Sequence, residues 1–225
     1  MNPPDFLNML KKALIHNGYV IESSVLADFL HYLELLSKWN KIYNLTSICD
    51  TEKMIFLHLL DSLSISPYLH GNNIIDVGTG AGLPGIPLAL LFPDKQFTLL
   101  DARLKKTRFL QQVVFELKLS NVCVETKRVE DFHPTVVFDS ILSRAFTSIN
   151  EMLMLTQHLI GDNGQFLAMK GVYPKLELKQ IPQDFKVLAV HSLMIKGLNA
   201  ERHLVCLQKE CSWEKSLPSS TKKAV

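Results

Sequence analysis

The chain has few of the features that would set it apart from ordinary globular proteins. Its 225 residues include four cysteines, Cys49, Cys123, Cys206 and Cys211, and none of them forms C-x-x-C or lies at metal-ligand spacing from a histidine. We therefore expect reduced thiols in a cytoplasmic protein, with no disulfide framework and no metal. No apolar run approaches the ~20 residues of a membrane helix. The first ten residues lack a basic segment before an apolar core, so we expect neither a membrane span nor a signal peptide.

Charge of one sign is also scarce, with a formal net charge of +2 and a pI of about 8.3. Such a balance does not by itself indicate a nucleic-acid partner, so that argument must come from where the cations lie. Apolar residues make up 47 % of the chain, which predicts a sizeable core. The length suits one catalytic domain with a modest addition, and we expect a monomer.

The N-terminal part reads as helices, with no strand signal before Asn73. Ser23 or Ser24 is a candidate cap for one helix, and Asp50 or Thr51 for another. Residues 38–46 between them read as a polar and aromatic connection. The predicted division is a helical element over 1–68, a second domain over 69–210, and a mobile tail over 211–225.

From residue 73 strands alternate with helices. The predicted strands are 73–77, 96–100, 122–126, 136–142, 164–169, 186–192 and 203–208. The predicted helices are 84–92, 103–119, 147–160 and a short one near 175–180. This alternation predicts an α/β fold with a mostly parallel seven-stranded sheet. Because little chain separates the last two strands, we expect a hairpin with one antiparallel strand at the end of the sheet.

The central stretch, residues 74–90, joins a short strand to a helix through a glycine-rich loop. The first turn glycine is Gly78, and in that frame Leu83 stands where a dinucleotide fold needs its third glycine. Asp76 before the loop would also face pyrophosphate, anion against anion. S-adenosylmethionine carries an ammonium and a sulfonium and no phosphate, so it suits this acid. The loop therefore favours S-adenosylmethionine over a dinucleotide or a purely structural turn.

The second predicted strand ends at Asp101, 23 positions after Gly78, near the spacing of an acid that binds ribose hydroxyls. Capping of the next helix is an alternative role, and both can hold at once. That helix opens with four cations, which oppose its dipole: Arg103, Lys105, Lys106 and Arg108. Because this helix starts at the ligand edge of the sheet, these cations are candidates for binding RNA phosphates. The alternative is a solvated face.

Two later segments also end at this edge of the sheet. In the loop after the third strand, Val129 is a candidate to cover the adenine and Glu130 to bind its amine, although the spacing does not separate Glu130 from Asp131. Arg128 there is a candidate for RNA or for a pair with Glu130. The fifth strand places Lys170 beside the acceptor. The fourth ends in Ser-Arg-Ala-Phe, without the motif typical of amine methylation and without an acceptor-site cysteine.

These residues resemble a family, the bacterial small-subunit ribosomal RNA guanine-N7 methyltransferases (glucose-inhibited division protein B family). The resemblance rests on residues 44–46, 56–63, 76–87, 99–101, 105–110, 143–146 and 170–171. It implies a Rossmann-like class I methyltransferase fold, S-adenosylmethionine as methyl donor, and N7-methylguanosine at position 527 of 16S rRNA as product. The partner would be that RNA or a small-subunit precursor. The family's cofactor contacts fall on Gly78, Leu83, Val129, Glu130 and Arg144.

Guanine N7 has a lone pair and no proton to lose, so we expect no general base and no catalytic side chain in that sense. Rate enhancement would come from positioning, with Arg144 and Lys170 near the acceptor. His58 and Asp61 share a helix face. They could form a structural hydrogen bond, or they could contact RNA or close over the cofactor. The roles of Trp39 and Asn44 are likewise not decided between structure and RNA binding. The alternative functions are a small-molecule methyltransferase, a catalytically silent RNA-binding module, and a nicotinamide dehydrogenase.

Overall fold

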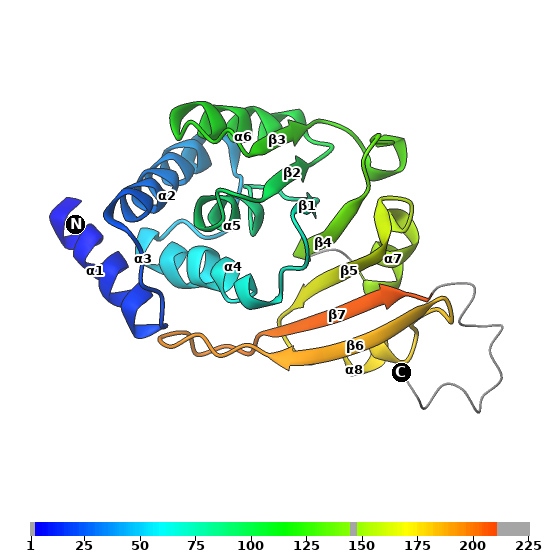
Figure 1. Cartoon of the computed structure of the whole chain (residues 1–225). Helices are drawn as coiled ribbons and strands as arrows, with labels where there is room; N and C mark the ends of the chain where they lie inside the picture. The colour runs from blue at the N-terminus through cyan, green and yellow to red at the C-terminus, as the bar shows by residue number, and fades with distance from the viewer. Residues whose placement is uncertain (1–2, 145–147, 211–225) are drawn as a thin grey trace.

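The computed structural model describes residues 3–144 and 148–210, which form a twisted sheet with helices on both faces (Figure 1). The seven strands run in the order β3-β2-β1-β4-β5-β7-β6. Their bounds are β1 (Asn73–Val77), β2 (Gln96–Leu100), β3 (Val122–Glu125), β4 (Phe138–Arg144), β5 (Ile160–Lys170), β6 (Phe185–Ser192) and β7 (His203–Lys209). Strands β1 to β5 are parallel, and β7 lies antiparallel between β5 and β6. The predicted fold class and the antiparallel strand are confirmed.

Strand β1 pairs with β2 on one side and with β4 on the other, so the strand order reverses at this strand. In open parallel sheets a ligand binds outside the carboxyl ends of the strands at such a switch point. The glycine-rich loop starts there, directly after Val77.

Alternation along β1 sends its side chains to two different layers. Ile74 packs with α5 (Gly85–Leu91) and Ile65 on one face, whereas Ile75 and Val77 pack with α7 (Ile149–Thr156) on the other. Figure 1 shows α4 (Asp61–Leu63), α5 and α6 (Leu104–Glu116) on the first face, and α7 on the other. Helices α1 (Pro3–His16) and α2 (Ser23–Tyr43) lie outside the first group. Two short helical turns, η3 (Val129–Asp131) and α8 (Lys175–Leu178), complete the second part of the chain.

From residue 3 onward, the structure has six helical segments before the sheet: α1 (Pro3–His16), α2 (Ser23–Tyr43), α3 (Thr51–Met54), the π-helix η1 (Ile55–Leu60), α4 (Asp61–Leu63) and η2 (Ser66–Tyr68). The predicted cap at Asp50 is confirmed, since its carboxylate accepts from the amides of Glu52 and Lys53 at 2.8 and 3.2 Å. The predicted cap of α2 is wrong, because Glu22 is the N-cap and makes no side-chain bond there.

The predicted connection over 38–46 is also wrong for most of its length, since α2 continues to Tyr43. Trp39 stacks on Tyr43 at 5.2 Å between ring centroids and packs on Phe109 of α6 at 5.7 Å. Asn44 ends the helix in the left-handed conformation, with φ of 50°. The ring contact with α6 therefore stabilises a helical conformation of this polar segment, which the local sequence does not predict.

Other boundaries differ by a few residues. Strand β4 starts at Phe138 and reaches Arg144, and β5 starts at Ile160, inside the end of the helix predicted over 147–160. The tail over 211–225 lies outside the described residues. Within 3–144 and 148–210, no helix has the length and apolar character needed to cross a membrane.

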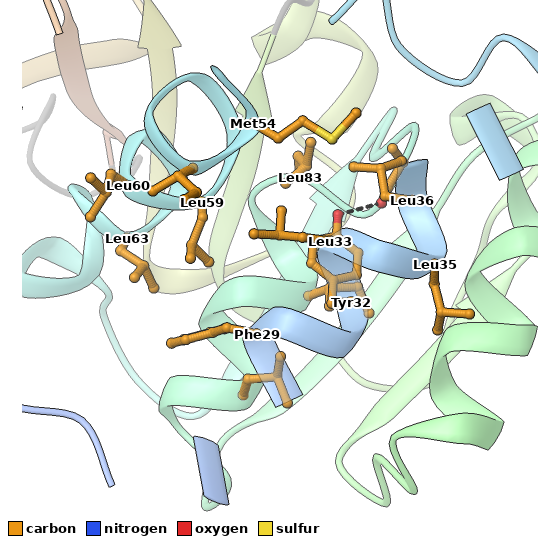
Figure 2. Packing of buried hydrophobic residues seen from close by; sticks show 14 of the residues in the cluster. Phe29, Tyr32, Leu33, Leu35, Leu36, Met54, Leu59, Leu60, Leu63 and Leu83 are labelled. Atoms are coloured by element: carbon orange, nitrogen blue, oxygen red, sulfur yellow. Dashed lines mark hydrogen bonds between the residues drawn. The ribbon is translucent and has the colours of Figure 1, made fainter. Parts of the chain in front are cut away.

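The N-terminal helices and the sheet share one core, and the glycine-rich loop is held in it. Figure 2 shows Leu83 of this loop near Tyr32, Leu33 and Met54, all members of one buried cluster. The Tyr32 hydroxyl donates a 2.7 Å hydrogen bond to the Ala81 carbonyl, and the ring is fully buried. The N-terminal helices therefore hold the glycine-rich loop in place through the Tyr32 hydrogen bond and the packing of Leu83.

Replacing Tyr32 by Phe should lower the free energy of unfolding by about 1–3 kcal/mol, because it leaves the buried Ala81 carbonyl without its donor. Chemical denaturation followed by circular dichroism measures the change. The matched control is Tyr43→Phe, on an exposed ring whose stacking survives the change. Equal effects of the two variants would contradict the role assigned to the Tyr32 hydroxyl.

Candidate functional site

The glycine-rich loop is tied to the end of the neighbouring strand. The amides of Gly78 and Thr79 donate to the Leu100 carbonyl at 2.8 and 3.2 Å. Gly82 has φ of +87°, and a Cβ there would lie 2.6 Å from Ile86 Cγ1 and 2.7 Å from Leu110 Cδ2. The loop therefore needs glycine at this position both for its backbone conformation and for its packing on α5 and α6.

Asp76 supports the loop from below. Its Oδ2 atom accepts from Thr79 Oγ1 at 2.6 Å and from the Gly85 amide at 2.9 Å, and the residue is fully buried. Burial raises the pKa of this carboxyl to about 6, and the two hydrogen bonds oppose that rise. Among the described residues, Oδ1 has no hydrogen-bond partner. The Asp76 carboxylate thus lies beneath the loop and binds the loop's own donors. Its role in this structure is to support the loop, and not to contact the cationic groups of a ligand directly.

A first cavity of about 540 Å³ opens at the carboxyl ends of β1, β2 and β3. It brings together four of the six predicted cofactor residues: Gly78, Asp101, Val129 and Glu130. The other two lie elsewhere. Leu83 is 3 % exposed within the N-terminal core, and Arg144 lines a different cavity.

Asp101 links this cavity to the loop. Its Oδ2 atom accepts from the Gly80 amide at 3.0 Å and lies 3.4 Å from Lys106 Nζ, and its Oδ1 atom accepts from the Arg103 amide at 2.9 Å. Arg103 is the N-cap residue of α6. Asp101 therefore binds the amide of the N-cap residue and no amide of α6 itself, so the predicted capping role is wrong. The carboxylate still lines the cavity, where the ribose role stays a prediction.

The short turn η3 forms the opposite wall. Val129 is buried against the α7 layer and still borders the cavity, while Glu130 is exposed. Arg128 is exposed at the rim, and no ion pair joins it to Glu130 among the residues that the structure describes. An apolar side chain beside an acidic one suits a ligand with a flat ring that bears a polar edge.

The four cations of α6 have different surroundings. Lys105 Nζ donates to the Tyr43 carbonyl at 3.0 Å, which satisfies the end of α2, and Lys106 pairs with Asp101. Arg103 and Arg108 are exposed, and Arg103 lies at the rim of the first cavity. Two of the four cations thus have partners within the protein, and the two arginines face solvent.

A second cavity of about 480 Å³ lies on the other side of the switch point, beyond Arg144. Its wall comes from the loop after α2, the π-helix η1, the ends of β4 and β5, and the start of β7. The residues are Thr46, Ser47, Ile48, Leu57, His58, Asp61, Arg144, Met169, Lys170, Gly171, Leu193, Arg202 and His203.

Asp61 joins three segments at this cavity. Its Oδ2 atom accepts from Arg144 Nη1 at 3.2 Å and its Oδ1 atom from Arg202 Nε at 2.7 Å. Arg144 also donates to the Leu57 carbonyl at 3.2 Å, and Asp61 is only 3 % exposed. The carboxylate therefore fixes both guanidinium groups at the cavity wall, which gives charge-assisted hydrogen bonds away from bulk water.

His58 does not bond to Asp61, although both line the cavity. His58 lies in the π-helix η1, a feature frequent at functional sites, and Asp61 is the first residue of α4. The His58 Nδ1 atom lies 3.0 Å from the Leu57 carbonyl and its Nε2 atom 2.9 Å from Thr46 Oγ1. A carbonyl only accepts, so Nδ1 carries the proton and Nε2 accepts from the threonine. Burial and the nearby Arg144 charge lower the pKa of His58 to about 4, so the ring is neutral.

Lys170, the other predicted residue near the acceptor, is held by an ion pair within the protein. Lys170 Nζ pairs with Glu177 Oε2 at 2.8 Å, and that oxygen also accepts from the Ile149 amide at 2.7 Å. Residues 145 and 146 of the Ser-Arg-Ala-Phe motif lie outside the described residues. No group of three potential metal ligands occurs in the described part of the chain.

Arg202 is a site residue that the sequence analysis did not select. The signal was present, because a predicted antiparallel strand over 203–208 must begin at the same edge where its parallel neighbours end. An arginine just before that strand is therefore brought to the ligand edge of the sheet.

Replacing His58 by Gln should change how stability depends on pH. The folded pKa lies below the unfolded value, so the stability contributed by this group is complete above pH 6.5 and is lost as pH falls towards 4. Between those values the wild type should lose up to about 1.4 kcal/mol per pH unit relative to the variant. Urea unfolding at several pH values measures the difference. A difference that stays constant over this range would contradict the neutral, buried ring.

Comparison with known proteins shows which family has this sequence. The family described as rRNA small subunit methyltransferase G matches residues 25–205. A ribosomal RNA small subunit methyltransferase G from Aeromonas salmonicida is 48 % identical over 199 residues, covering 88 % of this chain and 96 % of the relative. The Pseudomonas aeruginosa protein of that name is 51 % identical over 193 residues, covering 85 % and 90 %.

Solved structures agree on the fold. Coclaurine N-methyltransferase, bound to N-methylheliamine and SAH, aligns with a TM-score of 0.58 at 11 % identity, covering 92 % of this chain and 94 % of that one. TrmN from Thermus thermophilus aligns with a TM-score of 0.52 at 17 % identity, covering 66 % of this chain and 47 % of that one. With a family match over most of its length and relatives near 50 % identity, the chain belongs to the rRNA small subunit methyltransferase G family.

Proposed function

We propose that this protein transfers a methyl group from S-adenosylmethionine to N7 of a guanosine in 16S ribosomal RNA. The family resemblance implies guanosine 527 as the target. The observation that carries the proposal is the first cavity, which opens at the switch point of the sheet in a chain of the rRNA small subunit methyltransferase G family. We place this activity in the cytoplasm, on 16S RNA or a precursor of the small subunit.

The residues of the first cavity fit the donor. Asp101 offers a carboxylate for ribose hydroxyls, Val129 an apolar face for adenine, and Glu130 an acceptor for the adenine amine. Gly78 leaves the backbone open beside the donor. Leu83 acts from behind by holding the loop, and Arg144 is the group on the acceptor side with charge for the methionine carboxylate. When bound, S-adenosylmethionine supplies an electrophilic methyl group.

The second cavity lies at the ends of β4 and β5, next to Arg144 and Lys170, and we assign the acceptor to this side. Guanine N7 attacks through a lone pair and releases no proton, so the protein needs to hold the two reactants at ~3–3.5 Å and to exclude water. Arginine commonly reads guanine through O6 and N7 together. Here N7 must stay open to the methyl group, which leaves O6, a phosphate or the methionine carboxylate for Arg144.

The neutral state of His58 agrees with this scheme. Both of its ring nitrogens are occupied by Leu57 and Thr46, and burial holds its pKa near 4. The ring therefore has no free basic nitrogen, and we give it a structural role at the cavity wall. The exposed arginines Arg103 and Arg128 at the first cavity, together with the exposed Arg108 of α6, are the groups we propose for RNA phosphates.

The test is transfer of labelled methyl from S-adenosylmethionine to naked 16S rRNA, to the deproteinised small subunit and to the intact 30S subunit. We expect label in one of these RNAs, at a guanosine that becomes sensitive to reduction and aniline cleavage, which reports N7 methylation. Label on a small molecule alone, or donor binding without transfer, would instead indicate one of the alternative functions.

Asp101→Asn should reduce donor affinity at least tenfold in calorimetry and reduce transfer to match, because the ribose site loses a charge. Asp162→Asn, on an exposed acid at the other end of β5, is the matched control and should behave as wild type. An unchanged donor affinity in the Asp101 variant would contradict the ribose role.

Turnover should stay nearly flat between pH 6.5 and about 9, since no proton leaves N7 and His58 titrates far below this range. Single-turnover rates at saturating donor measure it. A steep loss with one ionisation inside the window, abolished by replacing one side chain, would reveal a general base.

A further inference from the structure

The second cavity carries an excess of positive charge. Its wall contains three cations, Arg144, Lys170 and Arg202, and one carboxylate, Asp61, while His58 is neutral. Lys170 pairs with Glu177 at 2.8 Å. Arg144 binds Asp61 and the Leu57 carbonyl, and the proposed function already assigns it to the reactants. Arg202 is therefore the cation of this wall that has no role yet and can bind another anion.

Arg202 is held in place and is still partly open. Its Nε atom donates to Asp61 at 2.7 Å and its Nη1 atom to the Glu201 carbonyl at 2.7 Å. A guanidinium has five N–H donors in a fixed fork, so several remain for another acceptor. Its side chain is about one-fifth exposed, at the start of β7 and at the cavity wall. Such a preoriented arginine suits a phosphate oxygen.

An exposed aromatic ring packs against His203 of the same cavity's wall. Tyr173, in the segment after β5, is 51 % exposed and meets the His203 ring edge to face, with centroids 5.6 Å apart and planes at 82°. His203 is buried in the cavity wall, and its Nδ1 atom lies 2.9 Å from the Gly171 carbonyl. The histidine thus fixes the tyrosine ring while much of that ring stays in solvent.

Two features near this tyrosine point to a nucleotide. A Cβ added at Gly171 would meet nothing within 4 Å, so the space above the end of β5 is open. Val172 and Leu176, close to the tyrosine in the sequence, are exposed apolar residues as well. Aromatic rings beside cations form the usual platform for unstacked bases, where the ring takes the base and the cation takes the phosphate.

We propose that Tyr173 and Arg202 form the binding subsite for the target nucleotide of the RNA. Tyr173 stacks on the extruded base or its immediate neighbour, and Arg202 binds the adjoining phosphate. Asp61 acts as a positioning residue that aims Arg202 and Arg144 together. This inference rests on the proposed function, and it assigns the acceptor's place to two side chains outside the first cavity.

The experiment measures kcat/KM for the RNA that the wild type methylates best, together with donor affinity. Tyr173→Ala should lower kcat/KM between about fivefold and about a hundredfold, the range of one base stack. Tyr173→Phe keeps the ring and should restore it. Phe115→Ala is the matched control, on a ring that is 78 % exposed at the far end of α6. Donor affinity should be unchanged in all three.

Arg202→Gln should lower kcat/KM at low salt, and the slope of log affinity for RNA against log salt should fall by about 1, as for one lost phosphate contact. Arg202→Lys should keep most of the slope. The matched control is Lys209→Gln, an exposed cation at the opposite end of the same strand.

Wild-type kinetics for both Tyr173→Ala and Arg202→Gln, in a preparation whose wild type methylates RNA, would overturn the subsite. If the wild type itself methylates no RNA, the proposed function fails instead. Should Arg202→Gln prove unstable, the exposed Tyr173 variants still decide the question. A loss in Tyr173→Ala that Tyr173→Phe does not restore would also contradict stacking.

Discussion

The carboxylate of Asp61 is the contact on which the arrangement of the site depends. It lies in the N-terminal helical element, and it holds Arg144 from the end of β4 and Arg202 from the start of β7. Breaking one side of a buried ion pair costs far more than its net contribution, because a charge is left without a partner. The position of both cations is therefore set by a segment that lies outside the sheet.

The N-terminal element has a second hold on the site through the glycine-rich loop. Tyr32 binds the loop at Ala81, Leu83 is buried among the N-terminal helices, and Asp76 braces the loop from within the sheet. The loop is thus held from both sides before any ligand arrives. Because the loop is already ordered, less conformational entropy is lost when a small ligand binds, and this favours affinity.

The two cavities divide the chemistry between them. The first presents Asp101, Val129 and Glu130, a combination of carboxylates and an apolar wall that suits a nucleoside. The second presents arginines around a neutral histidine, which suits an anion beside a base. Arg144 lies in the wall of the second cavity. The proposed reaction at N7 requires no proton transfer, so the task of the protein in it is to hold the two reactants in place.

The sequence by itself determined the strand alternation, the antiparallel hairpin, the glycine-rich loop and four residues of the first cavity, because these are local patterns at fixed spacing. Tertiary structure decided which charges remain available. Lys170 and Lys106 meet acids, Lys105 meets the end of α2, and Arg202 reaches Asp61 from 141 positions away. Spacing along a chain cannot show which cation a distant carboxylate will neutralise, since that pairing exists only after the segments have packed together.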